Sequence, residues 1–140
     1  MTNFDHLKKE PQFLSFADIA IAAENLIKVD VKACITNSRL ALETAIKWMY
    51  SIDEELVVPY QETLESLMHT EEFKTIVEDD LWKRLEFIRR ISSTVNNTTK
   101  KITFDQAELC LENLFIFFDF GNIEILQKEG TRCKDAIEYN

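Results

Sequence analysis

Apolar residues recur at helical spacing along most of this chain, and the strongest pattern covers Thr103 to Phe120. At 100° per residue, one face of this segment carries Ala107, Leu111, Leu114, Phe115 and Phe118, with Cys110 and Phe117 beside them. The opposite face carries Leu109, Ile116 and Phe120, and the charged residues form a narrow stripe of Asp105, Glu108, Glu112 and Asp119. A helix of this kind must be surrounded by other helices or by another chain. We therefore expect it, capped by Thr103, at the centre of a bundle.

Two further helices are predicted in the first half of the chain. The first begins at Ser15, which forms a capping-box pattern with Asp18, and its apolar residues continue to about Val29. The second follows a cap at Asp30 and extends for about 22 residues with a broad apolar face. Because of its length, we expect it to be a second central helix of the bundle.

Shorter helices are predicted in the middle of the chain. A loop at 54–61 precedes two amphipathic segments, Thr63–His69 and Glu71–Val77. Asp79 or Asp80 can cap the next helix, whose apolar pattern ends at the polar run 92–99. The fold class predicted from these patterns is all-α, a compact bundle of about five helices.

Composition supports one helical domain. The 140 residues are 46% hydrophobic, enough for a core, and contain only 2 Gly and 2 Pro, too few for frequent strand reversals. We expect an N-terminal arm at 1–14, the bundle at 15–127 and a polar, frayed tail at 128–140.

The cysteines and the absence of a long apolar run indicate a cytoplasmic protein. Cys34, Cys110 and Cys133 are odd in number and widely spaced, so we expect reduced thiols and no disulfide. No stretch reaches the roughly 18 apolar residues of a membrane span. We therefore predict no membrane association.

Positive charge is concentrated in one segment of an acidic chain. The net charge is -9, but six basic residues and one acid give 83–101 a net charge of +5; the basic residues are Lys83, Arg84, Arg89, Arg90, Lys100 and Lys101. Such a segment can contact nucleic acid or an acidic partner. It can equally be a solvated helix face whose cations complement the helix dipole. The bulk charge argues against a dedicated DNA-binding domain.

Two sets of charged residues are candidates for structural ion pairs. Arg39, Glu43 and Lys47 follow at four-residue steps and can pair along one side of the second helix. Arg89 projects to the edge of a buried face, where a guanidinium needs a carboxylate or carbonyl partner. We expect that partner to be Glu43 or an acid of the 103–120 helix. A catalytic role for Arg89 is the alternative.

Searches for catalytic, metal and cofactor motifs give no candidate. His6 and His69 lie in unrelated contexts, and a zinc site would have to recruit cysteines from core patterns. Two glycines cannot form a phosphate-binding loop, and no nucleophile elbow occurs. We predict no catalytic residue, no metal and no cofactor.

Several strings of the sequence, taken together, resemble one family. They are Phe16-Ala-Asp-Ile-Ala, Ala41-Leu-Glu-Thr-Ala-Ile-Lys-Trp-Met-Tyr50, Leu81-Trp-Lys-Arg-Leu-Glu-Phe-Ile-Arg-Arg90, and the stretch from Lys101 to Phe120. They look like the N-terminal helical domain of the restriction (R) subunit of some type I restriction–modification systems, a domain of the DUF4145 group related to the HEPN helical bundles. The resemblance covers about Asn3 to Phe120 and spans several helices in order.

This resemblance implies an accessory module placed ahead of a nuclease and an ATP-driven DNA-translocating motor. No Walker motif and no nuclease core is recognisable in the 140 residues, so we expect an excised domain or a truncated gene product that is not an enzyme on its own. Its expected partners are other subunits or domains of a restriction complex, with DNA contact through the basic segment. Because HEPN-like bundles often pair, a homodimer is also expected.

The alternative function is that of a HEPN-type RNA- or nucleotide-handling protein. HEPN ribonucleases carry an Arg followed after four to six residues by a His. Counting from Arg90, the best register places Asn97 at the histidine position. Without an imidazole, ribonuclease activity of that type is not expected, and Arg89 or Arg90 then keeps at most a binding or structural role, with Asn97 a candidate contact residue. An independent antitoxin-like regulator is a third hypothesis.

Overall fold

A computed structural model describes residues 14–52, 56–96 and 101–119 of the chain. Within these ranges it contains six α-helices and no strand. They are α1 (Leu14–Leu26), α2 (Val31–Ile52), α3 (Leu64–Met68), α4 (Glu71–Ile76), α5 (Asp79–Ser93) and a last helix spanning residues 104–119. The prediction of an all-α bundle is confirmed, with six helices in place of about five.

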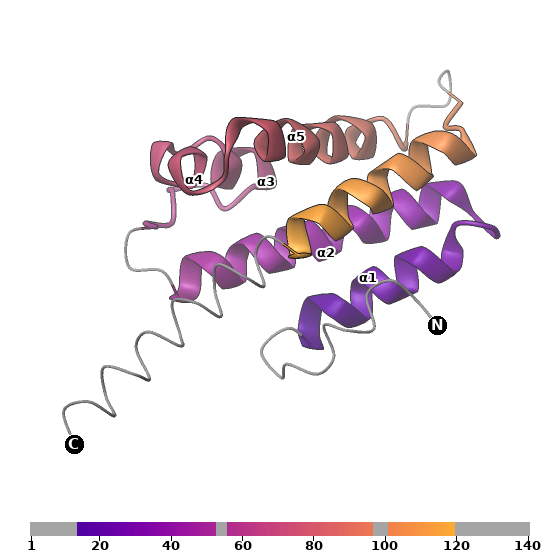
Figure 1. Cartoon of the computed structure of the whole chain (residues 1–140), viewed down its shortest axis with the longest axis horizontal. Coiled ribbons are helices and arrows are strands. Elements are labelled where there is room, and N and C mark those ends of the chain that lie inside the picture. The colour runs from indigo at the N-terminus through magenta and orange to yellow at the C-terminus, as the bar shows by residue number, and fades with distance from the viewer. Residues whose placement is uncertain (1–13, 53–55, 97–100, 120–140) are drawn as a thin grey trace.

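The longest helix, α2, occupies the middle of the bundle (Figure 1). α1 runs alongside it, and α5, with the short α3 and α4 at one end, lies on its other side. The 104–119 helix contacts α1 through the rings of Phe118 and Phe16, whose centroids are 5.0 Å apart. It contacts α5 through a hydrogen bond of 3.0 Å from Arg84 Nη1 to Asn113 Oδ1. The 104–119 helix therefore closes the bundle against helices from both halves of the chain.

Side-chain caps fix most helix starts. Asp30 Oδ1 accepts hydrogen bonds from the backbone N–H groups of Lys32 and Ala33 at 3.1 and 3.2 Å. Thr103 Oγ1 accepts from the N–H of Gln106 at 3.2 Å, while Gln106 Oε1 accepts from the N–H of Thr103 at 3.0 Å. The predicted caps at Asp30 and Thr103 are confirmed.

Two other predicted helix starts were wrong. Ser15 lies inside α1, which begins at Leu14, so it is not the first cap, and α1 ends at Leu26, three residues before Val29. A turn ends α1, because the N–H groups of Val29 and Asp30 both donate to the carbonyl of Leu26. The cap position of α5 is Glu78, whose side chain makes no capping bond. Asp79 and Asp80 lie in the first turn, where their charge complements the helix dipole.

The inward side of the 104–119 helix matches the predicted apolar face. Its buried residues are Ala107, Cys110, Leu111, Asn113, Leu114, Phe117 and Phe118. The predicted acidic stripe is exposed throughout. On the outward side, however, Leu109 is 40% and Phe104 42% exposed. The prediction that this helix is surrounded at the centre of the bundle was therefore wrong; it borders solvent along one side, and α2 takes the central position.

The structure describes only some of the predicted boundaries of the arm, the bundle and the tail. The described bundle begins at Leu14, one residue before the predicted limit. The predicted arm up to residue 13, the end of the bundle from 120 to 127 and the tail at 128–140 lie outside the described residues. Within the described ranges, no helix combines the length and apolarity needed to cross a membrane.

Candidate functional site

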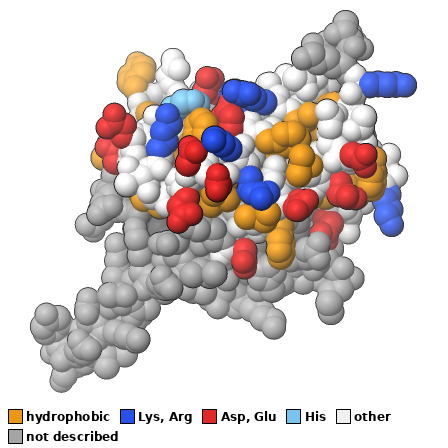
Figure 2. All heavy atoms as spheres, turned by 45° about the horizontal axis from the view of Figure 1, so that its top comes forward, with side chains coloured by type: hydrophobic (Ala, Val, Ile, Leu, Met, Phe, Trp, Pro, Cys, Tyr) orange, Lys and Arg blue, Asp and Glu red, His pale blue; other side chains and the backbone are white. Residues whose placement is uncertain are grey.

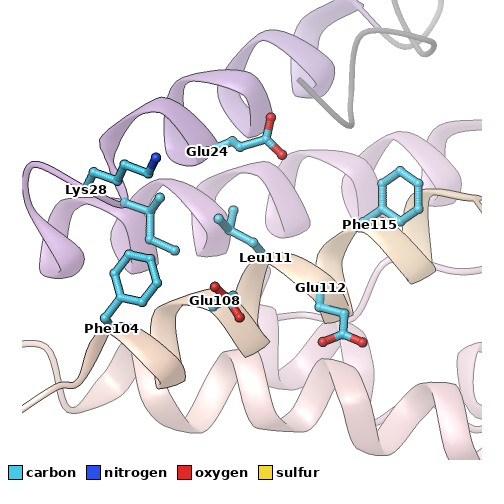
Figure 3. A pocket seen from close by; sticks show the side chains of 8 residues that line it. Glu24, Lys28, Phe104, Glu108, Leu111, Glu112 and Phe115 are labelled. Carbon is cyan, nitrogen blue, oxygen red and sulfur yellow. The ribbon is translucent and has the colours of Figure 1, made fainter. Parts of the chain in front are cut away.

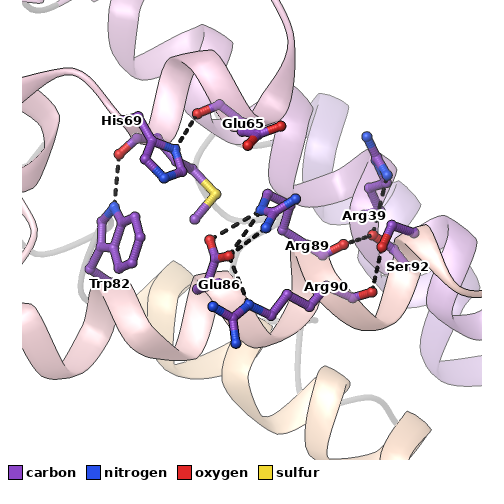
Figure 4. Close-up of polar contacts among 10 residues, drawn as sticks. Arg39, Glu65, His69, Trp82, Glu86, Arg89, Arg90 and Ser92 are labelled. Carbon is purple, nitrogen blue, oxygen red and sulfur yellow. Dashed lines mark hydrogen bonds and ion pairs between the residues drawn. The ribbon is translucent and has the colours of Figure 1, made fainter.

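The strongest polar constellation is a cluster of charges on α5, centred on Glu86 (Figure 4). Glu86 is 8% exposed, and its carboxylate accepts hydrogen bonds from Arg89 Nη2 at 2.5 Å and Arg89 Nε at 3.1 Å. Arg90 Nε donates to the same carboxylate at 3.0 Å. The hydrogen bond from Arg89 is the main cause that lowers the pKa of Glu86, and it outweighs burial, which acts in the opposite direction. Glu86 is therefore ionised and paired at neutral pH.

The prediction of the carboxylate that pairs with Arg89 was wrong. Neither Glu43 nor an acid of the 104–119 helix pairs with Arg89; the partner is Glu86, one turn earlier on the same helix. The hydrogen bond to Glu86 also raises the pKa of Arg89 above its ordinary value. Trp82 and Arg89 lie four and three residues from Glu86 on α5, so all three residues are neighbours on one side of this helix. Arg89 therefore has the structural pairing role predicted for it, with a different carboxylate.

Arg39 joins α2 to the end of α5. Its Nη1 donates to Ser92 Oγ over 3.4 Å, and Ser92 Oγ donates to the carbonyl of Arg89 at 2.8 Å. Glu43 instead pairs with Lys47 at 3.3 Å, as predicted. No ion pair joins Arg39 to Glu43, both of which the structure describes. Of the two ion pairs predicted along α2, Glu43–Lys47 is confirmed and Arg39–Glu43 is wrong, because Arg39 points toward α5.

The remaining cations of the basic segment are dispersed. Lys83 pairs with Asp79 at 3.2 Å in an exposed i,i+4 contact, and Arg84 donates to the buried amide of Asn113. Lys101 is exposed just before the 104–119 helix. Asn97 and Lys100 lie outside the described residues. On the face drawn in Figure 2, basic and acidic side chains alternate, so this face offers phosphates no continuous positive patch.

His69 belongs to an aromatic corner where α3 meets α5. Its Nδ1 is 2.6 Å from the carbonyl oxygen of Glu65, and its ring meets Trp82 edge-on with centroids 5.3 Å apart. Trp82 Nε1 donates to the carbonyl of Met68 at 2.7 Å, and Lys74 Nζ lies 5.2 Å from the Trp82 ring centroid. These contacts hold the short helices against α5 (Figure 4). No group of three potential metal ligands occurs among the described residues.

Two buried thiols lie beside one serine in the core. Burial raises the pKa of Cys34 to about 11 and that of Cys110 to about 12, while a hydrogen bond with Ser38 acts in the opposite direction on each. Both residues are free thiols with 0% exposure. Since the thiolate is the reactive form, these cysteines are core residues, as predicted.

An open groove between α1 and the 104–119 helix is the feature that sequence reasoning missed. It has a volume of about 360 Å³ and is lined by Ile27, Phe104, Leu111 and Phe115, together with the charged residues Glu24, Lys28, Glu108 and Glu112. In Figure 3, Phe104 and Leu111 are directed toward the side of the groove formed by α1, which carries Glu24, and by the turn after it, which carries Lys28. The only signal for it in the sequence was the excess of apolar residues on the 104–119 helix, because the position of α1 is a property of the tertiary fold.

Comparison with protein-family models, curated proteins and solved structures finds no match to this chain.

Proposed function

We propose that this chain is a non-catalytic docking module of the restriction subunit of a type I restriction–modification system. It would hold another subunit or a neighbouring domain through the surface of its helical bundle, and it would act in the cytoplasm, where such enzymes meet DNA. The observation that carries the proposal is the groove between α1 and the 104–119 helix, whose apolar lining is left open by the bundle.

An open apolar lining favours a protein partner. The Phe104 side chain is 42% exposed at the mouth of the groove, and Phe115 is half-buried along it. Aromatic side chains that stand in a concave surface contribute strongly when a partner covers them. Leu109, on the other margin of the exposed acidic stripe, is also open to water. The 104–119 helix therefore has an exposed apolar surface, as its sequence pattern indicates.

The basic segment also favours a protein partner over a nucleic acid, because its arginines are already bound to other side chains of the chain. Arg89 and Arg90 both donate to Glu86, and Arg84 donates to Asn113. A phosphate that recruited Arg89 would have to displace a nearly buried carboxylate. The contacts of Arg89, whose side chain is 21% exposed, weigh against the alternative of an RNA-handling protein in which this arginine faces the substrate; the Arg90 side chain is 76% exposed.

Mixing experiments test the docking proposal. The full chain is combined with the purified modification, specificity and motor–nuclease polypeptides of a type I system from the same genome, and the mass of each complex is measured by size-exclusion chromatography with light scattering. We expect a complex of defined stoichiometry with at least one polypeptide. The proposal is overturned if the chain elutes alone while the other subunits assemble and methylate DNA.

Two further measurements decide the expectations of dimerisation and DNA contact. The chain alone is measured by light scattering at several concentrations, and a concentration-dependent doubling of mass would support the proposed homodimer. Short duplex DNA is then added at low and moderate salt. Binding with a steep salt dependence would move the function from the groove to the basic segment.

A further inference from the structure

We infer that the groove between α1 and the 104–119 helix binds one basic amphipathic helix of another polypeptide. The inference rests on the proposed docking function and names the chemistry of the partner and the place where it binds. Its basis is the shape, the lining and the charge of the groove.

The shape of the groove matches a helix. Two helices form its walls, and its apolar residues run from Phe104 to Phe115 along one of them. These two positions are separated by roughly 16 Å along the helix axis, or about three turns. An amphipathic helix of the same length can place apolar side chains at i, i+3 or i+4 and i+7 between the walls. An extended peptide would find no strand edge there, since the described part of the chain contains none.

The order of residues around the 104–119 helix separates an apolar margin from an acidic one. At 100° per residue, Phe104 and Phe115 lie within about 20° of each other, and Glu108 follows immediately beside them. Glu112, Asp119 and Asp105 continue the acidic stripe away from α1. Figure 3 shows Glu112 on the side of the helix away from α1. A helix lying on Phe104 and Phe115 would therefore have carboxylates along its flank.

The charge of the groove lining favours a positively charged partner. The lining contains the carboxylates of Glu108 and Glu112 on the 104–119 helix, besides Glu24 and the one cation, Lys28. Glu108 and Glu112 are exposed, and neither forms an ion pair with a basic residue in the described ranges. Lys or Arg residues on the flanks of an incoming helix would complement them and speed association.

The same charge argues against two other occupants. In a twofold dimer formed through this groove, the acidic lining of one copy would face the acidic lining of the other, and the like charges would repel. A nucleic acid would bring phosphates to carboxylates. The groove thus favours a basic helix of a different chain.

A designed peptide tests this inference directly. The probe is a fluorescein-labelled peptide of about 14 residues, long enough for the three turns of the groove, with Leu at the helical anchor positions and Lys elsewhere. Its comparison peptide keeps every Leu and replaces each Lys by Glu. Binding to the full chain is measured by fluorescence anisotropy. We expect the Lys peptide to bind and the Glu peptide to bind at least about tenfold more weakly.

Matched variants locate the binding. The double variant Glu108→Lys, Glu112→Lys reverses the lining, and the double variant Glu71→Lys, Glu72→Lys makes the same change at two exposed acids on α4. We expect the first to weaken binding of the Lys peptide about tenfold or more and the second less than about threefold. Phe104→Ala removes the exposed aromatic ring and should weaken binding by about tenfold. Circular dichroism and thermal unfolding establish that each variant is folded.

Three results would overturn the inference. Equal losses in the two double variants would show attraction by bulk charge only. Equal binding of the two peptides would remove the role of the acidic lining. Self-association of the chain that is abolished by Phe104→Ala would assign the groove to a second copy.

The subunit mixture separates this inference from the proposed function. If the Glu108→Lys, Glu112→Lys variant loses the complex and the α4 variant keeps it, the groove is the docking site. A complex that survives both variants overturns the groove as that site and leaves the docking function standing. If the unmodified chain forms no complex, the proposed function fails, while the peptide measurements still decide what the groove binds.

Discussion

The 104–119 helix has apolar residues on two sides, and the bundle covers only one of them. On the inward side Cys110, Leu114 and Phe117 are at most 1% exposed and complete the core. On the outward side Phe104 and Leu109 are at least 40% exposed. Both sides have the same helical periodicity, so a pattern of apolar residues shows that a helix needs neighbours without showing whether they belong to the same chain.

Charged residues at the edge of the core and charged residues beside the groove differ in the same way. Glu86 lies at the edge of the core, and the chain supplies Arg89 and Arg90 within one turn of it. Glu108 and Glu112 lie beside the groove and have no basic partner among the described residues. The inward residues are thus satisfied by the fold, and the outward ones remain available to a partner.

A pair of phenylalanine variants gives the largest test of this difference. Phe117→Ala should lower the free energy of unfolding by about 3–5 kcal/mol, because it removes a fully buried ring and leaves a cavity. Phe104→Ala, on the same helix, should lower it by less than about 1 kcal/mol. Both are measured by urea unfolding followed by circular dichroism. Equal losses would mean that the groove side of this helix belongs to the core as much as its inward side does.

The cluster on α5 gives the next largest effect. Glu86→Gln keeps the size of the side chain but removes the charge that Arg89 and Arg90 bind, so we expect a loss of about 1–3 kcal/mol at pH 7. The pKa of Glu86 is lowered from its ordinary value of 4.5, so the carboxylate stabilises the fold above that pH and the contribution disappears as the pH falls through the lowered pKa.

Urea unfolding from pH 7 to pH 3 checks both parts of this prediction. The difference between Glu86→Gln and the unmodified protein should shrink below pH 4.5. Glu62→Gln, at an exposed position, is the control and should change stability at pH 7 by less than about 0.5 kcal/mol. A difference for Glu86→Gln that is independent of pH would contradict the assigned ion pair.

These effects indicate what the sequence could predict. The all-α class, the caps at Asp30 and Thr103 and the inward face of the last helix follow from local spacing and local hydrogen bonds, so one sequence was enough. The Arg89 partner was missed because it was sought on other helices, although three-residue spacing on α5 brings Glu86 and Arg89 together. The groove could not be predicted, since it depends on how far α1 and the 104–119 helix are separated in the fold.

The buried thiols should make the protein less stable at alkaline pH. The folded state holds the pKa of Cys34 at about 11 and that of Cys110 at about 12, against an ordinary value of 9.0. Both thiols therefore support the fold fully below pH 9, and their contribution is lost as the pH rises from the ordinary to the raised values. At pH 10 we expect a loss of about 1 kcal/mol for each thiol.

Urea unfolding between pH 8 and pH 10.5 measures this alkaline loss. The protein is compared with the double variant Cys34→Ala, Cys110→Ala, and Cys133 is replaced by Ser in both. The double variant should lose less stability on going to alkaline pH, whatever its stability at pH 8. Parallel pH profiles would show that the two thiols do not titrate as their burial requires.

The smallest effect is expected at the exposed pair of Lys83 and Asp79, which tests whether a charged contact outside the core matters at all. The two side chains are 69% and 80% exposed, and water competes for their ion pair of 3.2 Å. Lys83→Gln should therefore change the free energy of unfolding by less than about 0.5 kcal/mol, and added salt should remove even that difference. Urea unfolding at low and high salt measures it, with Glu86→Gln as the contrasting variant. A loss at Lys83 as large as that at Glu86 would mean that burial does not decide which ion pairs hold this bundle together, and the distinction between its inward and outward sides would then fail for charged residues.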